Sequence, residues 1–243
     1  MFEKSEKAKE IGIDASLEGG GNANMKSLTY RSILVSIGIL AILPAIGLGQ
    51  QRCGELLPET ARYHDRQDDY LDPHPAVRRH LKLVNDYHFR LQIRQLKGNP
   101  VDIANNLDYT LLHFPNYHEA LYTASRFERL QGRKLPQKAE WTWRRSAECY
   151  FIRAIRFRPK DGVVRMLYGI HLHKSGELEQ ALEQYEIGLD LIPDSSELNY
   201  NLGLLYFELK KYQLAKKYAA TAYELGYPLP GLKTLLEKEG YWP

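Results

Sequence analysis

GVVRMLYGIHLHKSGELEQALEQYEIGLDLIPDS (residues 162–195) is followed directly by SELNYNLGLLYFELKKYQLAKKYAATAYELGYPL (residues 196–229), and the two stretches share one pattern at a period of thirty-four. Small residues hold matched positions in both copies: Gly169 and Gly203, Ala181 and Ala215, Gly188 and Ala222. Small residues at helical spacing let two antiparallel helices approach closely. Each copy is therefore predicted to be a helical hairpin that stacks on its neighbour to bury an apolar face.

The spacing resembles the tetratricopeptide repeat (TPR) family. The best match is Leu202, Gly203, Tyr206 and Ala215, which occupy four consensus places of the helix-turn-helix repeat. The resemblance implies an all-α fold, a TPR solenoid of about four repeats closed by a C-terminal capping helix. It also implies a protein or peptide partner bound by the array.

The same phase extends the array over residues 77–243. The predicted repeats are 84–117, 118–161, 162–195 and 196–229, and a capping helix is expected over 232–239. Asp102 is the predicted N-cap of the second helix in the first repeat. The second repeat holds ten residues more than the period requires, between Gly132 and Ala147.

The chain ahead of the array has three predicted segments. Residues 1–24 are polar and Gly-rich, which indicates disorder or a true start at Met25. Residues 25–49 are predicted to be a secretory signal peptide, because positive charges precede the apolar run Ile33 to Leu48 and a small-residue cleavage motif. The alternative is an uncleaved signal anchor in the inner membrane. Residues 50–76 are predicted to be an extended lead-in that crosses the array.

The chain has two cysteines, Cys53 and Cys149. In an exported protein they are predicted to form a disulfide that pins the lead-in to the second repeat, whereas in the cytosol both remain thiols. The segments Glu148-Cys149-Tyr150-Phe151, Arg156-Phe157-Arg158-Pro159 and Tyr227-Pro228-Leu229-Pro230-Gly231 are similar to exported bacterial TPR proteins. Periplasmic localisation is therefore expected.

Charge is distributed unevenly along the array. Residues 77–160 hold 17 Lys or Arg against 7 Asp or Glu, while residues 161–243 hold 8 against 12. No phosphate-binding loop, nucleophile motif or metal-ligand motif occurs, so no catalytic, cofactor-binding or metal site is predicted. An enzyme with a dispersed site stays an alternative, and an exported chain is not expected to bind nucleic acid.

The TPR resemblance implies that partners contact the first helix of each repeat. The corresponding residues of the predicted concave face are Asn85, His88, Gln92, Tyr122, Arg126, Arg129, Met166, Ile170, His173, Tyr200, Leu204 and Phe207. A second predicted contact is the insertion, with Trp141, Arg144 and Arg145, because Trp and Arg dominate binding hot spots. In the competing interpretation, a helix that starts at Pro136 buries Trp143 on its inner face.

Together these features predict an exported scaffold that mediates protein-protein interaction in the assembly or organisation of a bacterial envelope complex. If the apolar run stays uncleaved, the chain is instead a membrane-anchored adaptor that recruits a partner at the inner membrane.

Overall fold

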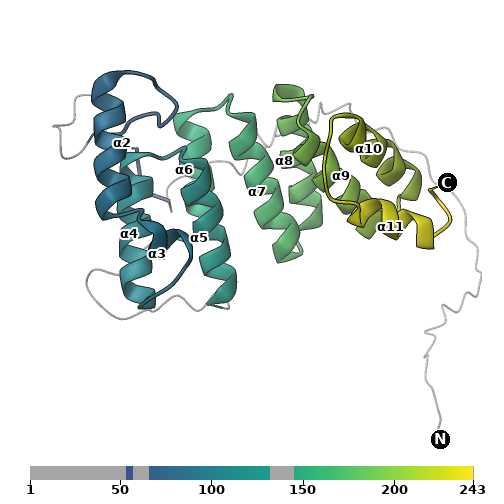
Figure 1. Ribbon diagram of the computed structural model, residues 1–243, viewed down its shortest axis with the longest axis horizontal. Helices are drawn as coiled ribbons and strands as arrows, with labels where there is room; N and C mark the ends of the chain where they lie inside the picture. The colour runs from purple at the N-terminus through teal and green to yellow at the C-terminus, as the bar shows by residue number, and fades with distance from the viewer. Residues whose placement is uncertain (1–52, 57–65, 132–144, 243) are drawn as a thin grey trace, which may run out of the picture. The chain divides into compact units, whose positions relative to one another are not determined.

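The computed structural model of this protein describes residues 53–56, 66–131 and 145–242, all of which belong to one compact unit. The described residues form helices and contain no strand (Figure 1). The helices are α2 (Pro75–Tyr87), α3 (Leu91–Arg94), α4 (Pro100–His113), α5 (His118–Leu130), α6 (Ala147–Phe157), α7 (Gly162–Ser175), α8 (Leu178–Leu191), α9 (Ser196–Glu208), α10 (Tyr212–Glu224) and α11 (Gly231–Lys238). The predicted all-helical fold is confirmed.

Successive helices pack as pairs. α7 packs against α8 and α9 against α10, and these are the two hairpins that the thirty-four-residue period predicts (Figure 1). α5 packs against both α6 and α7, and α8 packs against α9, so each pair also contacts the next. This pairwise stacking buries the apolar face that a single hairpin leaves open.

Side-chain caps set where the helices begin. Asp161 accepts a hydrogen bond from the Val164 amide at 3.1 Å ahead of α7, and Ser195 accepts one from the Leu198 amide at 3.2 Å ahead of α9. These bonds satisfy amides that have no partner within the helix. At the matched C-terminal ends of α7 and α9 the backbone turns left-handed, with φ of 81° at Gly176 and 57° at Lys210.

The first predicted repeat departs from the expected capping. Asn99, not Asp102, is the N-cap of α4, since its side chain accepts from the Val101 amide at 2.8 Å. Pro100 takes the first helical position, where its missing N–H costs nothing, and Asp102 lies inside the first turn. The short helix α3 separates α2 from α4 in this part of the chain.

The predicted lengthened helix of the second repeat is also wrong. α6 begins at Ala147, and its N-cap Ser146 has extended backbone and accepts a hydrogen bond from the Cys149 amide at 3.2 Å. A helix continuous from Pro136 cannot pass through this extended residue. Trp141, Trp143 and Arg144 lie outside the described residues.

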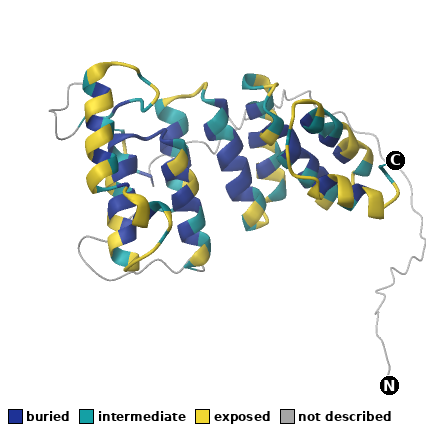
Figure 2. Ribbon diagram, in the orientation of Figure 1, coloured by how far each residue is buried: buried dark blue, intermediate teal, exposed yellow. Residues whose placement is uncertain are grey.

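Small residues make the close approaches inside each pair. A Cβ on Gly169 would come within 2.4 Å of the Tyr185 ring, so α7 and α8 lie as close as a glycine allows. On α9, a Cβ on Gly203 would come within 3.3 Å of the Ala215 carbonyl of its pair partner α10, and within 2.6 Å of Leu232 on the capping helix α11. Figure 2 shows that buried residues gather on the helix sides that face neighbouring helices.

α11 closes the C-terminal end of the array. Its Leu232 and Leu236 are fully buried, and the Leu232 amide donates to the Tyr200 hydroxyl of α9 at 3.2 Å. α11 spans Gly231–Lys238, within one residue of the helix expected over 232–239. The predicted capping helix is therefore present.

Residues 66–72 of the lead-in run along the C-terminal end of α4. The Asp68 amide donates to the His113 carbonyl at 2.8 Å, and the Gln67 side chain donates to the Leu112 carbonyl at 2.8 Å. These bonds satisfy carbonyls that the last turn of a helix leaves unpaired. Among the described residues, no helix is both long and apolar enough to cross a bilayer; the run Ile33 to Leu48 lies outside them.

Candidate partner-binding surface

The first helices α5, α7 and α9 follow one another in the array. α5 packs against α7, and α7 packs against α9. Their predicted contact residues fall on all three: Tyr122, Arg126 and Arg129 on α5, Met166, Ile170 and His173 on α7, and Tyr200, Leu204 and Phe207 on α9. We call this set the first-helix surface.

α5 supplies the most accessible part of the first-helix surface. The Tyr122 side chain is 41% exposed, and the Arg126 guanidinium lies 5.9 Å from the centre of its ring. Arg129 is half-buried and donates to the Ser125 hydroxyl at 2.6 Å, and burial lowers the pKa of its guanidinium. An aromatic ring flanked by two cations suits an acidic peptide that also carries apolar side chains.

On α7 and α9 much of the first-helix surface belongs to the core. Met166, Ile170 and Tyr200 are at most 9% exposed, and the Tyr200 ring stacks on Tyr227 at 4.0 Å between centroids. Leu204 and Phe207 remain half-buried and accessible. α9 therefore offers a partner a smaller contact area than the sequence alone indicates.

One ion pair links the neighbouring first helices. His173 Nε2 on α7 lies 2.9 Å from the Glu208 carboxylate on α9. The pair joins equivalent ends of two consecutive repeats. His173, which the sequence predicts to contact another protein, is therefore already paired with a residue of this chain.

The predicted residues of the first repeat form a separate group around α2 and α3. Asn85 Oδ1 accepts hydrogen bonds from Arg94 at 3.0 Å and from the Tyr117 hydroxyl at 3.2 Å, so it has a structural role. His88 stacks on Tyr109, with 3.7 Å between ring centroids, and Gln92 is exposed on α3.

Burial lowers the pKa of His88 below its ordinary value of 6.5; the hydrogen bond to Asn106 partly opposes this shift, and the charge of Arg90 adds to it. We expect its ring protons to titrate below that value in an NMR pH titration. Because the folded-state pKa is depressed, protonation of His88 destabilises the fold as pH falls below 6.5. His88→Gln identifies the resonance, and a midpoint above 6.5 would contradict the burial argument.

Comparison with known proteins identifies a repeat family in the part of the chain that forms α7, α8 and α9. Residues 170–210, which run from within α7 to the end of α9, match a protein family described as TPR repeat. The chain contains tetratricopeptide repeats. A segment of 58 residues is 36% identical to intraflagellar transport protein 70A of Danio rerio. That segment is 24% of this chain and 9% of the Danio rerio protein.

Two solved structures are similar to this chain at low sequence identity and low TM-score. MamA is 18% identical, with 67% of this chain and 81% of the MamA chain covered and a TM-score of 0.45. A double mutant, MamA RS-1 ArsTM, is 20% identical, with 66% and 86% covered and a TM-score of 0.46.

Of the three residues predicted to form the insertion contact, Arg145 belongs to the described structure. Arg145 donates to the Asp108 carboxylate of α4 at 2.7 Å, and its side chain is 25% exposed. The predicted insertion contact thus has one of its three residues paired inside the chain. Trp141 and Arg144 lie outside the described residues, so this contact stays a prediction.

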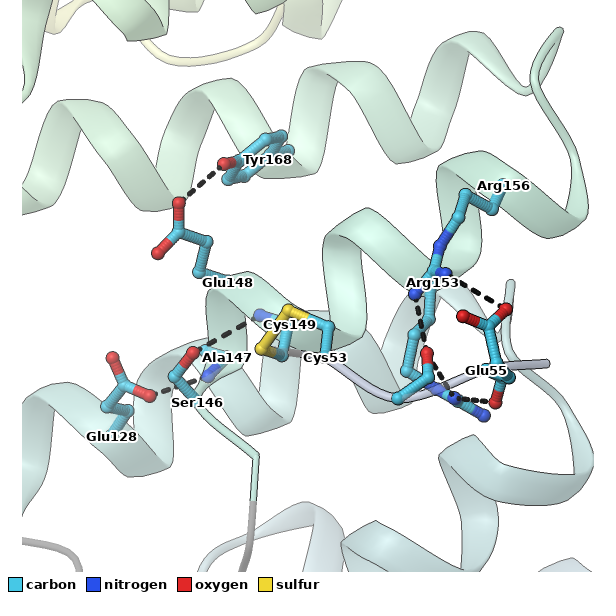
Figure 3. The surroundings of a disulfide bond; sticks show 11 residues. Cys53, Glu55, Glu128, Ser146, Ala147, Glu148, Cys149, Arg153, Arg156 and Tyr168 are labelled. Carbon is cyan, nitrogen blue, oxygen red and sulfur yellow. Dashed lines mark hydrogen bonds and ion pairs between the residues drawn. A yellow bond between two sulfur atoms is a disulfide. The ribbon is translucent and has the colours of Figure 1, made fainter. Parts of the chain in front are cut away.

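The disulfide between Cys53 and Cys149 is present and joins the lead-in to α6 (Figure 3). Residues 53–55, which we call the strap, lie along α6 beside two arginines. Arg153 donates to the Glu55 carbonyl at 2.6 Å, and Arg156 donates to the Gly54 carbonyl at 2.7 Å (Figure 3). The strap thus gives main-chain acceptors to cations of the second repeat.

Arg153 is a buried charged side chain that the sequence analysis did not single out. It is 1% exposed, and its Nε and Nη2 have no hydrogen-bond partner among the described residues. Burial, together with the nearby charges of Arg145 and Arg156, lowers its pKa from 12.5 to about 10. No sequence signal reveals this, because its acceptors come from residues nearly a hundred positions earlier.

Several cavities open on the described surface. One of about 590 Å³ lies where the lead-in meets the turns before α5 and α7. One of about 420 Å³ lies beside the ends of α5 and α7, and one of about 250 Å³ lies between α2 and α4. No group of three His, Cys, Asp or Glu in this part of the chain is placed to hold a metal ion.

Proposed function

We propose that this protein is an exported, non-enzymatic TPR scaffold that binds another protein through its first-helix surface. Its proposed role is assembly or organisation of a bacterial envelope complex. The observation that carries the proposal is the Cys53–Cys149 disulfide within a repeat array that serves protein interaction. Disulfides persist in oxidising compartments such as the periplasm, whereas cytosolic thiols are kept reduced.

The apolar run Ile33 to Leu48 supports the same compartment, since it follows Lys26 and Arg31 as the core of a signal does. If it stays uncleaved, the repeats are tethered at the inner membrane and face the same oxidising space. The anchored adaptor is thus a second candidate that differs in attachment and keeps the same binding surface.

Intact mass of the protein purified from its native host separates these candidates. A species that begins at Gln50 and is lighter by two hydrogens than the dithiol form supports the exported scaffold. A longer species with the same disulfide, recovered with the membrane, supports the anchored adaptor. Two free thiols in protein whose cysteines are alkylated at lysis would contradict both.

Photo-crosslinking in the native host tests the binding surface. A photoreactive amino acid replaces Tyr122 or Phe207 of the first-helix surface, and Leu214 on the second helix α10, 39% exposed, is the matched control. We expect one crosslinked protein at both Tyr122 and Phe207 and none of it at Leu214. Equal capture at all three positions would contradict the first-helix surface as the binding face.

Charge reversal on α5 extends this test. Arg126→Glu should weaken capture at Phe207 by about fivefold at low salt, because it turns attraction for an acidic partner into repulsion. Lys216→Glu on α10 makes the same charge change away from the surface and should leave capture unchanged.

A further inference from the structure

The cavity of about 590 Å³ has an apolar interior and a polar rim. Its apolar wall comes from Leu71 of the lead-in, Pro159 and Val163 around the start of α7, and Ile192 at the end of α8. Volume and lining are those of a ligand site, in which a few polar groups orient an apolar body. None of the residues of the first-helix surface lines this cavity.

Both carboxylates at the rim already have partners inside the chain. Asp69 accepts from the Asn116 side chain at 2.7 Å and from the guanidinium of Arg158. Asp161 lies 2.9 Å from His118 Nε2 and also caps α7. With their oxygens already engaged by residues of the chain, these carboxylates do not make the rim a site for a cation.

The charged group at the rim that has no partner among the described residues is a cation. Lys160 is exposed and forms no ion pair or hydrogen bond with any described residue. The side chain of Arg158, two positions earlier in the chain, is 53% exposed although it pairs with Asp69. An anion that enters the cavity mouth therefore meets one free cation and one partly exposed one.

A buried acceptor belongs to the same wall. Asn116 lines the cavity and is fully buried, and its Oδ1 has no hydrogen-bond partner among the described residues. Its amide nitrogen donates to Asp69, which fixes the oxygen as the unsatisfied atom. An unpaired buried acceptor costs free energy until a donor reaches it.

We propose that this cavity receives the carboxyl-terminal residue of a partner protein, when that residue has a large aliphatic side chain. The side chain packs between Leu71, Val163 and Ile192, and the terminal carboxylate pairs with Lys160. The choice of a peptide rests on the protein-binding role proposed above, whereas the apolar and anionic chemistry rests on the cavity alone.

A photo-affinity peptide tests this on the purified, disulfide-bonded full chain. The probe is a flexible Gly-Ser peptide that ends in photo-leucine, made once with a free carboxylate and once as the amide. Mass spectrometry of the digested protein should place the label of the acid form on segments that contain Leu71, Val163 or Ile192. The amide form should label them about fivefold less, since it lacks the charge that pairs with Lys160.

Two variants with matched controls separate the parts of the site. Leu71→Asp should reduce labelling by at least about tenfold, because it removes an apolar wall and adds a repelling charge. Leu214→Asp on α10, also partly exposed, is its control and should leave labelling unchanged. Lys160→Glu should abolish the preference for the acid over the amide, and Lys216→Glu should retain it.

Equal labelling by the acid and the amide, or label placed away from the cavity, would overturn the proposal. So would competition by octanoate without competition by the unlabelled peptide, since that outcome assigns the cavity to an anionic lipid. Failure here leaves crosslinking at Tyr122 and Phe207 unaffected, because the two tests probe different residues.

Discussion

Replacing both Cys53 and Cys149 with alanine is expected to lower the free energy of unfolding by about 2–4 kcal/mol. The disulfide joins residues 96 positions apart, so it removes a long loop from the unfolded chain. The chain-entropy model gives about 4–5 kcal/mol for a loop of this length, and measured values are usually lower. Urea unfolding of oxidised wild type and the double variant measures the difference.

The disulfide also holds the strap in place for Arg153. Without it, the Glu55 carbonyl that accepts from Arg153 at 2.6 Å is tethered only by the chain, and a fully buried guanidinium loses acceptors. A buried charge without partners is costly, whereas a methionine of similar length needs none. We therefore expect the cysteine substitutions to cost about 1 kcal/mol less when Arg153→Met is already present.

Single substitutions supply the control for this cycle. Cys53→Ala and Cys149→Ala should each lower stability as much as the pair does, because either one breaks the same bond. Wild type in a dithiol reductant should match them. A change below about 0.5 kcal/mol would mean that the disulfide stabilises neither the array nor the strap.

Gly169→Ala is expected to lower the free energy of unfolding by about 1–2 kcal/mol, although alanine is the better helix former. A Cβ at this position would come within 2.4 Å of the ring of Tyr185, which is fully buried and has no room to move. The ring or the whole of α8 must shift, which separates the two helices of the repeat.

Gly188→Ala is the matched control, since Gly188 also lies inside a helix of the same repeat. Its Cβ would meet Arg165 and Leu198 at 3.4 Å, which is ordinary contact. Helix propensity should then dominate and raise stability by up to about 1 kcal/mol. Equal effects of the two substitutions in urea unfolding would contradict the close approach of α7 and α8 at Gly169.

The sequence by itself determined the repeating helical hairpins. Small residues such as Gly169 and Ala181 recur with a period of thirty-four residues. Two helices can approach this closely only where their contact residues are small. The start of α9 is set in the same local way, because its N-cap Ser195 accepts a hydrogen bond from the amide of Leu198, three residues ahead. Such features depend on neighbours in the chain, so the residues alone reveal them.

Sequence preferences for helix caps were insufficient where two residues could each begin the same helix. Asn99 and Asp102 are both good caps three residues apart, and the backbone selects Asn99 because Pro100 fits the first helical turn. The helix expected from Pro136 gives way to one that begins at Ala147, after the Ser146 cap. Propensity does not decide between such alternatives, since each satisfies the same hydrogen bonds locally.

Only the tertiary structure decided which candidate site residues remain accessible. Met166, Ile170 and Tyr200 occupy first-helix positions, but neighbouring helices cover them. Arg153 obtains its acceptors from the strap, and the cavity beside Lys160 combines residues from the lead-in, α7 and the end of α8. These features arise from contacts between distant segments, and a periodic pattern carries no information about which distant segments meet.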